Sequence, residues 1–259
     1  MAIPFSLRTP RVIMALILRE MSTTYGRSAG GYFWVVAEPV FGIVLLTAMF
    51  SLMMRAPPLG TSFALFYGSG VVPFLAYMST QQKIATAVQF SRGLLVYPRV
   101  TFLDAALARF VLNGVTQILV AYLILSALLL TQDTRAVVDF GIVSQAMALT
   151  LFLGFGVGAL NCVLFSILPT YQRIWAILNR PMFIVSGIFF TYDAMPPFAQ
   201  DILWWNPLIH IVGLMRRGLY PTYAGDYISV NYVLFFAAIP AVLGVFFLRR
   251  YHKKILNEL

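Results

Sequence analysis

The chain has 259 residues, of which 60% are hydrophobic and only 10% are charged. Soluble domains carry about 25% charged residues, so this composition indicates a membrane protein and excludes a large soluble catalytic domain. Lys and Arg number 18 against 9 Asp and Glu, and the net charge of +9 must lie on little polar surface. Such a surface favours anionic lipids or anionic substrates.

The counts of reactive residues exclude several kinds of site. Cys162 is the single cysteine, so one chain can form neither a disulfide nor a cysteine-based metal site. His210 and His252 lie far apart without an acidic cluster, so we expect no metal site. No lysine follows a glycine, which excludes the Gly-Lys-Ser/Thr phosphate loop. We therefore predict that the chain does not hydrolyse ATP by itself, and we assign a catalytic role to none of its residues.

Residues 1–31 predict a cytoplasmic helix at the membrane interface. Thr9 followed by Pro10 is a suitable helix start, because proline fits the first helical position behind an N-cap residue. Arg11 and Arg19 lie on one face of this helix, while apolar residues fill the others, which is typical of an amphipathic interfacial helix. A secretory signal peptide is the alternative, but the charge at Arg19 interrupts the apolar run.

Six apolar segments are suited to crossing a bilayer, for which a helix needs about 20 residues. They cover residues 32–54, 62–81, 105–130, 140–168, 174–190 and 230–248. We therefore predict an all-α integral membrane protein with six transmembrane helices, in which residues 1–259 form a single transmembrane domain.

Residues 196–220 are also apolar, but Asn206 and Pro207 interrupt them. A helix from Pro207 to Arg217 would be about 16 Å long, half of the hydrocarbon core of a bilayer. Asn206 is a suitable N-cap, and Gly218 is a suitable C-terminal stop. The sequence therefore predicts a pair of short re-entrant helices before the last span.

The distribution of basic residues predicts the orientation. Of the 18 Lys and Arg residues, only Arg55, Arg135, Arg216 and Arg217 fall on one side of the predicted membrane. The positive-inside rule makes the other side cytoplasmic, and both termini lie there.

The cytoplasmic loop between the second and third predicted spans contains an apolar stretch, which we assign to a short helix over residues 91–104. Such a helix needs a surface to cover it. A groove on a partner protein and the membrane surface would both bury the same side chains, and the sequence does not separate them.

Glu38 lies inside the first predicted span, about 9 Å along the helix from Tyr32. A carboxylate within the membrane is a candidate for function. The alternative, which we favour, places Glu38 near the cytoplasmic interface in an ion pair with Arg27.

Arginine far outnumbers lysine, which suits a highly anionic substrate because the guanidinium binds phosphate or carboxylate through two hydrogen bonds. Codon bias would give the same excess. Most aromatic residues should form interface belts or core packing, and a minority are candidates to line the path of a sugar chain. The candidates for the substrate entrance and path, with the arginines on the cytoplasmic rim, are Arg8, Arg11, Arg27, Trp34, Glu38, Tyr67, Phe74, Tyr77, Arg92, Arg99, Arg173 and Arg180.

Three groups of residues resemble the permeases of ABC transporters that export polysaccharides. Those similar to the start of these permeases are Leu18-Arg19-Glu20, Tyr25-Gly26-Arg27, Gly30-Gly31-Tyr32-Phe33-Trp34 and Glu38-Pro39. Those similar to their cytoplasmic coupling helix are Arg92, Gly93, Leu94, Leu95, Tyr97 and Pro98, with Phe90 and Ser91 before them. Those similar to their re-entrant signature are Trp205, Asn206, Pro207, His210, Arg216 and Arg217, after Met195-Pro196-Pro197.

The resemblance covers essentially the whole chain and is greatest to the Kps-type permeases of capsular polysaccharide exporters. It implies a permease subunit in the bacterial inner membrane that exports a lipid-linked, acidic capsular polysaccharide. It also implies a homodimer, two copies of a separate ATPase subunit that binds ATP and Mg, a periplasmic adaptor or co-polymerase, and an outer-membrane polysaccharide channel. No nucleic acid is expected among the partners.

Two alternative functions remain open from the sequence. Within transporters, the cargo could instead be O-antigen, teichoic acid or a small drug. In another class, a membrane-embedded glycosyl- or acyltransferase would need a carboxylate pair or a catalytic histidine near the membrane face. The sequence contains no Asp-x-Asp, and His210 is predicted to be external.

Overall fold

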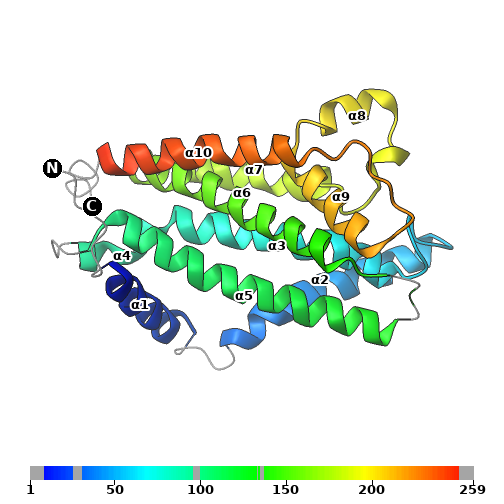
Figure 1. The fold of residues 1–259 in the computed structure, drawn as a ribbon, viewed down its shortest axis with the longest axis horizontal. Coiled ribbons are helices and arrows are strands. Elements are labelled where there is room, and N and C mark those ends of the chain that lie inside the picture. Colours follow the sequence, from blue (N-terminus) through cyan, green and yellow to red (C-terminus); the bar gives the residue numbers. More distant parts are fainter. Residues whose placement is uncertain (1–8, 26–30, 96–99, 133, 135–136, 251–259) are drawn as a thin grey trace.

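The described part of the chain forms a bundle of α-helices (Figure 1). The structure, a computed structural model, describes residues 9–25, 31–95, 100–132, 134 and 137–250. Within these ranges every regular element is helical. The predicted site residues that lie outside the described residues are Arg8, Arg27, Tyr97, Pro98 and Arg99.

Five helices in the described ranges are long and apolar enough to cross a membrane. They are α2 (Gly31–Met53), α3 (Phe63–Ala85, with the short helix that continues it), α5 (Phe102–Thr131), α6 (Phe140–Ile167) and α10 (Val230–Arg250). Each begins within a few residues of a predicted span. Four of them also end within a few residues of it, whereas the continuation of α3 extends to Leu95, beyond the predicted end at residue 81. The all-α membrane fold class is thereby confirmed.

Capping side chains explain where three of these helices begin. Ser62 Oγ accepts a hydrogen bond from the backbone N–H of Leu65 at 3.3 Å, at the start of α3. Thr101 and Asp104 form a reciprocal capping box at the start of α5, and Asp139 caps α6. Each such cap contributes about 1 kcal/mol by satisfying a backbone donor that has no partner within the helix.

The fifth predicted span, 174–190, corresponds to α7 (Pro169–Val185), which has only 17 residues and contains Arg173 and Arg180. It is absent from the five long apolar helices, so the count of six remains a prediction. The helix lies five residues earlier than predicted for 174–190. Pro169 fixes its first turn, and the positive φ of 82° at Gly187 follows its end.

The helix predicted for residues 91–104 has different bounds. Thr86 breaks α3, and α4 (Ala87–Leu95) continues directly from it. Val100 and Thr101 are not helical, and the next residues already belong to the first turn of α5. The capping box at Thr101 marks the start of α5 and so separates α5 from α4. The apolar pattern alone did not show this boundary.

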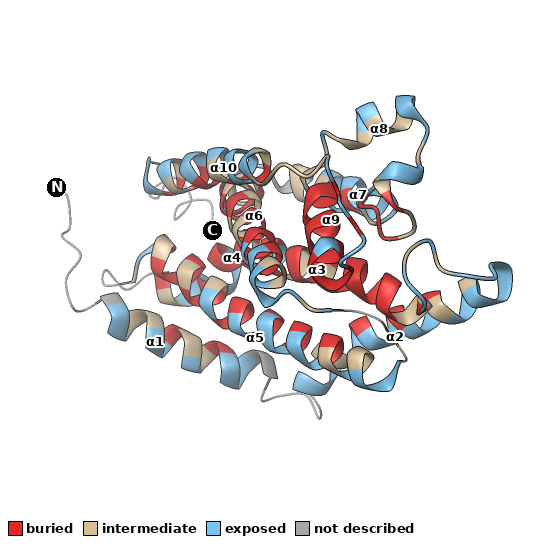
Figure 2. Cartoon of the chain, turned by 45° about the vertical axis from the view of Figure 1, so that its right-hand side comes forward, coloured by how far each residue is buried: buried red, intermediate tan, exposed pale blue. Residues whose placement is uncertain are grey.

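The centre of the bundle is α3, whose buried side chains extend along nearly its whole length (Figure 2). It packs against α2, α5, α6 and α9. Two glycines of α6 allow the close approach, since a Cβ at Gly154 would meet the side chain of Thr80 and one at Gly158 would meet the backbone of Gln81. By contrast, 17% of the apolar stretch of α2 is buried, against 72% for α3, so α2 is peripheral.

The bundle has two distinct ends (Figure 1). One carries α1 (Thr9–Glu20), which continues as a short π-helix (Met21–Tyr25), and α4; we call it the α1–α4 end. The opposite end, the α8 end, carries a 3₁₀ turn (Tyr192–Ala194) and α8 (Pro197–Leu203).

Residues 196–220 form two short helices, as predicted. The second, α9 (Pro207–Leu219), begins at Pro207 and is buried against α3 and α6 over most of its length. Trp205 and Arg217 are exposed. The entry of these two helices into the membrane as a re-entrant pair stays a prediction.

Candidate functional site

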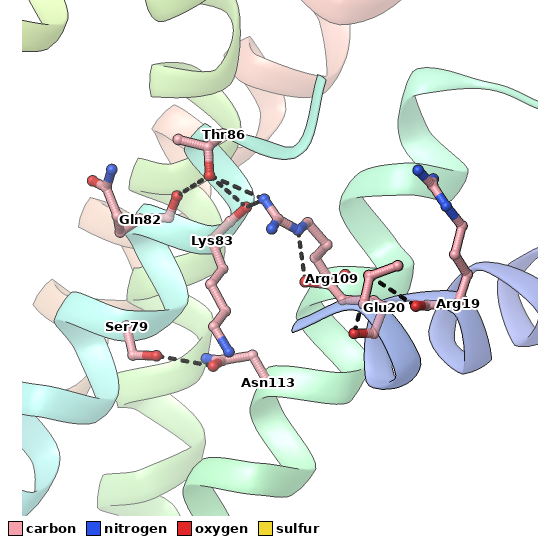
Figure 3. A network of polar contacts seen from close by, with 9 residues as sticks. Arg19, Glu20, Ser79, Gln82, Lys83, Thr86, Arg109 and Asn113 are labelled. Carbon is pink, nitrogen blue, oxygen red and sulfur yellow. Dashed lines mark hydrogen bonds and ion pairs between the residues drawn. The ribbon is translucent and has the colours of Figure 1, made fainter. Parts of the chain in front are cut away.

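Three helices meet at a buried arginine near the α1–α4 end (Figure 3). Arg109 of α5 is 7% exposed. Its Nε donates to Glu20 Oε1 of α1 at 2.9 Å, and its Nη1 donates to the carbonyl oxygen of Lys83 at 2.7 Å and to the hydroxyl of Thr86 at 3.0 Å. The guanidinium therefore ties α1 and α5 to the junction between α3 and α4.

The ring of Phe90, on α4, covers this guanidinium. Arg109 Cζ lies 4.2 Å from the ring centroid, and Arg19 Cζ lies 5.7 Å from it. Cation–π contacts of this kind contribute about 0.5–2 kcal/mol, more when they are desolvated. A displacement of α4 would therefore strain its contacts with both α1 and α5.

The outer face of α4 combines charge and apolar surface. Arg92 and Gly93 are exposed, and Leu94 is half-buried. Leu95 is only 6% exposed and belongs to the same apolar cluster as Phe102. The structure therefore places Leu95 inside the bundle, whereas the coupling prediction treated it as part of a docking face.

A second polar cluster joins α7 to the centre of the bundle. Gln81 Oε1 accepts hydrogen bonds from Trp175 Nε1 at 3.2 Å and from Asn161 Nδ2 at 3.5 Å. The hydroxyl of Tyr171 donates to Asn161 Oδ1 at 3.2 Å. The first half of α7 is thus fixed to α3 and α6 by side-chain hydrogen bonds.

The two arginines of α7 lie at different depths. Arg173 and Arg180 are both exposed, and two helical turns, about 10 Å, separate them. Arg180 lies about 16 Å along the axis from Pro169, which is half of a hydrocarbon core of about 30 Å. Arg11 and Arg92, which were predicted for the cytoplasmic rim together with Arg180, are exposed at the α1–α4 end. The rim position of Arg180 stays a prediction.

The other predicted path residues divide into two groups. Trp34 and Glu38 are exposed on α2. Tyr67, Phe74 and Tyr77 are at most 6% exposed and belong to the main apolar cluster. Their burial makes these three residues part of the core packing, so they do not line an open path in this structure.

The start of α9 is held by two polar side chains. Asn206 caps the helix, and its Nδ2 donates to the carbonyl oxygen of Val185 at 2.9 Å. His210 Nε2 donates to the carbonyl oxygen of Trp204 at 2.8 Å, while Nδ1 accepts from the backbone N–H of Ser229 at 3.2 Å. These contacts require the neutral imidazole with its proton on Nε2.

The end of α9 carries Arg216, which is 1% exposed. Its Nη1 and Nη2 donate to the carbonyl oxygens of Phe190 at 2.7 Å and Ile188 at 3.1 Å. Its Cζ lies 4.2 Å from the ring centroid of Phe66. Burial lowers the pKa of Arg216 to about 10, partly offset by nearby tyrosines. The side chain therefore stays charged at neutral pH and holds the loop after α7 against α9.

Among the described residues, no three His, Cys, Asp or Glu side chains lie close enough together to hold a metal ion. Cys162 is buried.

The sequence matches the model of the ABC-2 type transporter family over residues 11–220. The chain belongs to this family. The match includes α1, the α3–α4 junction with its buried arginine, and both short helices before α10.

Several polysaccharide transport and export proteins are similar to this ABC-2 family member over almost its whole length. The polysialic acid transport protein KpsM of Escherichia coli is 28% identical over 246 residues, which are 95% of either chain. The capsule polysaccharide export inner-membrane proteins BexB of Haemophilus influenzae and CtrC of Neisseria meningitidis serogroup B are 25% and 24% identical, over 95% of this chain and 92% of theirs.

The sequence analysis of this ABC-2 protein did not select the residues at the centre of the α1–α4 end. Glu20 appeared only among the residues that carry the family resemblance, and Arg109 only among the basic residues of the cytoplasmic side. The available signal was that Glu20 is the only acidic residue of α1 and Arg109 the only basic residue of α5, since buried charges are usually paired.

Proposed function

We propose that this chain is the membrane-spanning permease subunit of an ABC transporter that exports lipid-linked capsular polysaccharide across the bacterial inner membrane. The observation that carries this proposal is the full-length similarity to proteins of three organisms, each named for the transport or export of a capsular or polysialic acid polymer. Membership of the ABC-2 family gives a transport role with an ATPase partner. That partner would bind the ATP and Mg.

The exposed faces of α2 and α7 support a homodimer. Glu38 is exposed on α2, about 10 Å along the axis from Gly31, and Arg180 is exposed on α7, about 16 Å from Pro169. An ionised side chain at the centre of a bilayer costs at least about 2.5–3.5 kcal/mol, so it normally faces protein or a water-filled path. A second copy that covers these faces would remove this cost.

The same two helices supply the proposed cargo path. Arg173 and Arg180 present guanidinium groups at successive depths, and Trp34 adds an exposed aromatic ring on α2. A guanidinium binds carboxylate or phosphate through two hydrogen bonds, which fits an acidic polymer with a lipid anchor. Arg11 and Arg92, at the α1–α4 end, would gather this polymer at the entrance.

The proposed ATPase docking surface is the outer face of α4, formed by Arg92, Gly93 and Leu94. Its base is fixed to α1 and α5 through Arg109. Nucleotide-driven movement of the ATPase would therefore act on three helices together.

The orientation that we propose places the α1–α4 end in the cytoplasm. Arg249 and Arg250 end α10 there, whereas Asp193 and Asp201 lie at the α8 end. The positive-inside rule favours this direction. The α8 end would then face the periplasmic adaptor and the outer-membrane channel.

Replacement of Arg180 by glutamine tests the cargo path. In a capsule-producing host that depends on this permease, Arg180→Gln should reduce surface polymer at least tenfold, because it removes the charge at half depth. Arg180→Lys should retain part of the export, since it keeps the positive charge but loses the planar guanidinium that binds an anion through two hydrogen bonds. The control is Arg55→Gln, which alters an exposed arginine outside the helices.

Polymer that accumulates inside the cells would show that synthesis continues and would argue against the transferase alternative. Normal surface polymer from Arg180→Gln, at matched membrane levels, would contradict the proposed path.

A further inference from the structure

A hollow of about 450 Å³ lies between α6 and α10, outside the sites described above. Phe152 and Phe155 of α6 form one wall, and the other side consists of a stripe along α10 that includes Ala238, Ala241 and Arg249. Figure 1 shows these two helices side by side along the bundle. Apart from Arg249, the side chains that line the hollow are apolar.

Close packing of the two backbones explains why this groove exists. A Cβ added to Gly156 would meet the carbonyl oxygen of Ala237, and one added to Gly244 would meet the backbone of Ala159. The helices therefore touch at small residues. Beside these contacts, alanine side chains are too short to fill the space between the phenylalanine rings and α10, so a groove remains.

The dimensions of the groove match one leaflet of a bilayer. From Ala238 to Arg249 the helix advances about 16 Å, half of a hydrocarbon core of about 30 Å. Val242 and Phe246, which lie along the groove, are 67% and 55% exposed, as expected for side chains that face hydrocarbon. Arg249 lies in the last turn of α10, where the headgroups of that leaflet begin.

We propose that this groove binds an anionic phospholipid of the leaflet at the α1–α4 end, with one acyl chain between α6 and α10 and the phosphate on Arg249. A volume of about 450 Å³ is within the range of about 300–1,000 Å³ for small-molecule sites. The guanidinium provides the charge complementarity, because it binds phosphate oxygens through two hydrogen bonds. The exposed side chains of Val242 and Phe246 line the groove, so bilayer phospholipid can reach it directly.

Native mass spectrometry of the purified full chain tests this proposal. The protein is titrated with phosphatidylglycerol or with phosphatidylcholine that has the same acyl chains. A single cation near an anionic headgroup contributes about 1 kcal/mol, so we expect about fivefold tighter binding of phosphatidylglycerol. Arg249→Gln should remove this preference, and the matched control Arg250→Gln, one residue further and outside the groove, should keep it.

A second variant tests the acyl-chain site independently of the charge. Ala238→Phe fills the groove from a half-buried position, and it should abolish retention of both lipids while the protein keeps its melting temperature. The proposal is overturned if Arg249→Gln keeps the preference, if Arg250→Gln loses it equally, or if Ala238→Phe binds phosphatidylglycerol like the unaltered chain.

Discussion

Two buried arginines stabilise opposite ends of the molecule by different means. Arg109 has a carboxylate partner in Glu20, whereas Arg216 is held by two carbonyl oxygens and an aromatic ring. Both need compensation because a buried charge without hydrogen bonds is costly. Glu20 and Arg109 are 89 residues apart, so local sequence patterns could not connect them.

The ion pair of Glu20 and Arg109 should behave as a coupled unit. Glu20→Gln leaves the Arg109 charge buried without its carboxylate and should lower the free energy of unfolding by about 3–5 kcal/mol. Arg109→Gln should have a similar effect, and the double variant should lose less than the sum. Thermal unfolding in detergent measures these effects. Arg11→Gln, on the exposed face of α1, is the control, and strict additivity would contradict the coupling.

His210 should make stability depend on pH. Burial lowers its pKa below the usual 6.5, although hydrogen bonds with backbone carbonyls oppose this effect. The unfolded chain therefore takes up a proton at a higher pH than the folded one, so stability is full above about pH 6.5 and falls as the pH decreases towards the lowered pKa. Protonation would also place a donor on Nδ1, opposite the N–H of Ser229.

Melting temperatures between pH 7.5 and 5 measure this effect. The decrease on acidification should be smaller in His210→Gln than in the unaltered chain. An identical pH profile in both would contradict a role for His210.

At the scale of elements, the apolar pattern predicted the long helices. It did not predict the bounds of helices that begin or end at a few polar residues. Spans such as 140–168 were predicted closely because about 20 apolar residues suffice to define them. The start of α7 was missed because polar residues such as Arg173 follow Pro169. The bounds of α4 were missed because Thr101 caps α5 inside an apolar stretch. The sequence also could not show that Tyr67 is buried, since helix rotation depends on tertiary packing.

The outer face of α4 should be required for recruitment of the ATPase. Leu94→Asp should reduce co-purification of the ATPase at least tenfold, because burial of a carboxylate in an apolar docking groove costs several kcal/mol. Leu94 is suited to this test because it is half-buried, whereas Leu95 supports the core. The control is Gln82→Asp, an exposed position one turn before α4. Equal recruitment by both variants would assign the docking surface to another part of the chain.

At the scale of the whole molecule, the packing is strongly asymmetric. The central helices α3 and α9 are buried on most sides, whereas α2 and α7 keep much of their surface uncovered (Figure 2). The last helix, α10, is also peripheral, with 22% of its apolar stretch buried. A bundle that is complete at its centre and open along its outer helices fits a subunit of a larger assembly. The open face of α7 carries the two arginines, Arg173 and Arg180, that a path for an acidic polymer needs. Dimerisation and transport would then use the same surface.

The topology of the α8 end provides the last prediction. Tyr192, before α8, stacks on Tyr227, after α9, with ring centroids 4.0 Å apart. The segment between these two tyrosines, which contains α8 and α9, therefore begins and ends at the same end of the bundle. Cysteines at the neighbouring exposed positions Asp193 and Asp226 should lie on the same side of the membrane. In intact cells, Asp193→Cys and Asp226→Cys should both react with a membrane-impermeant thiol reagent. Cys162 is fully buried and should give little background. Labelling of only one of the two positions would mean that residues 196–220 cross the membrane, and the six-span topology would then be wrong.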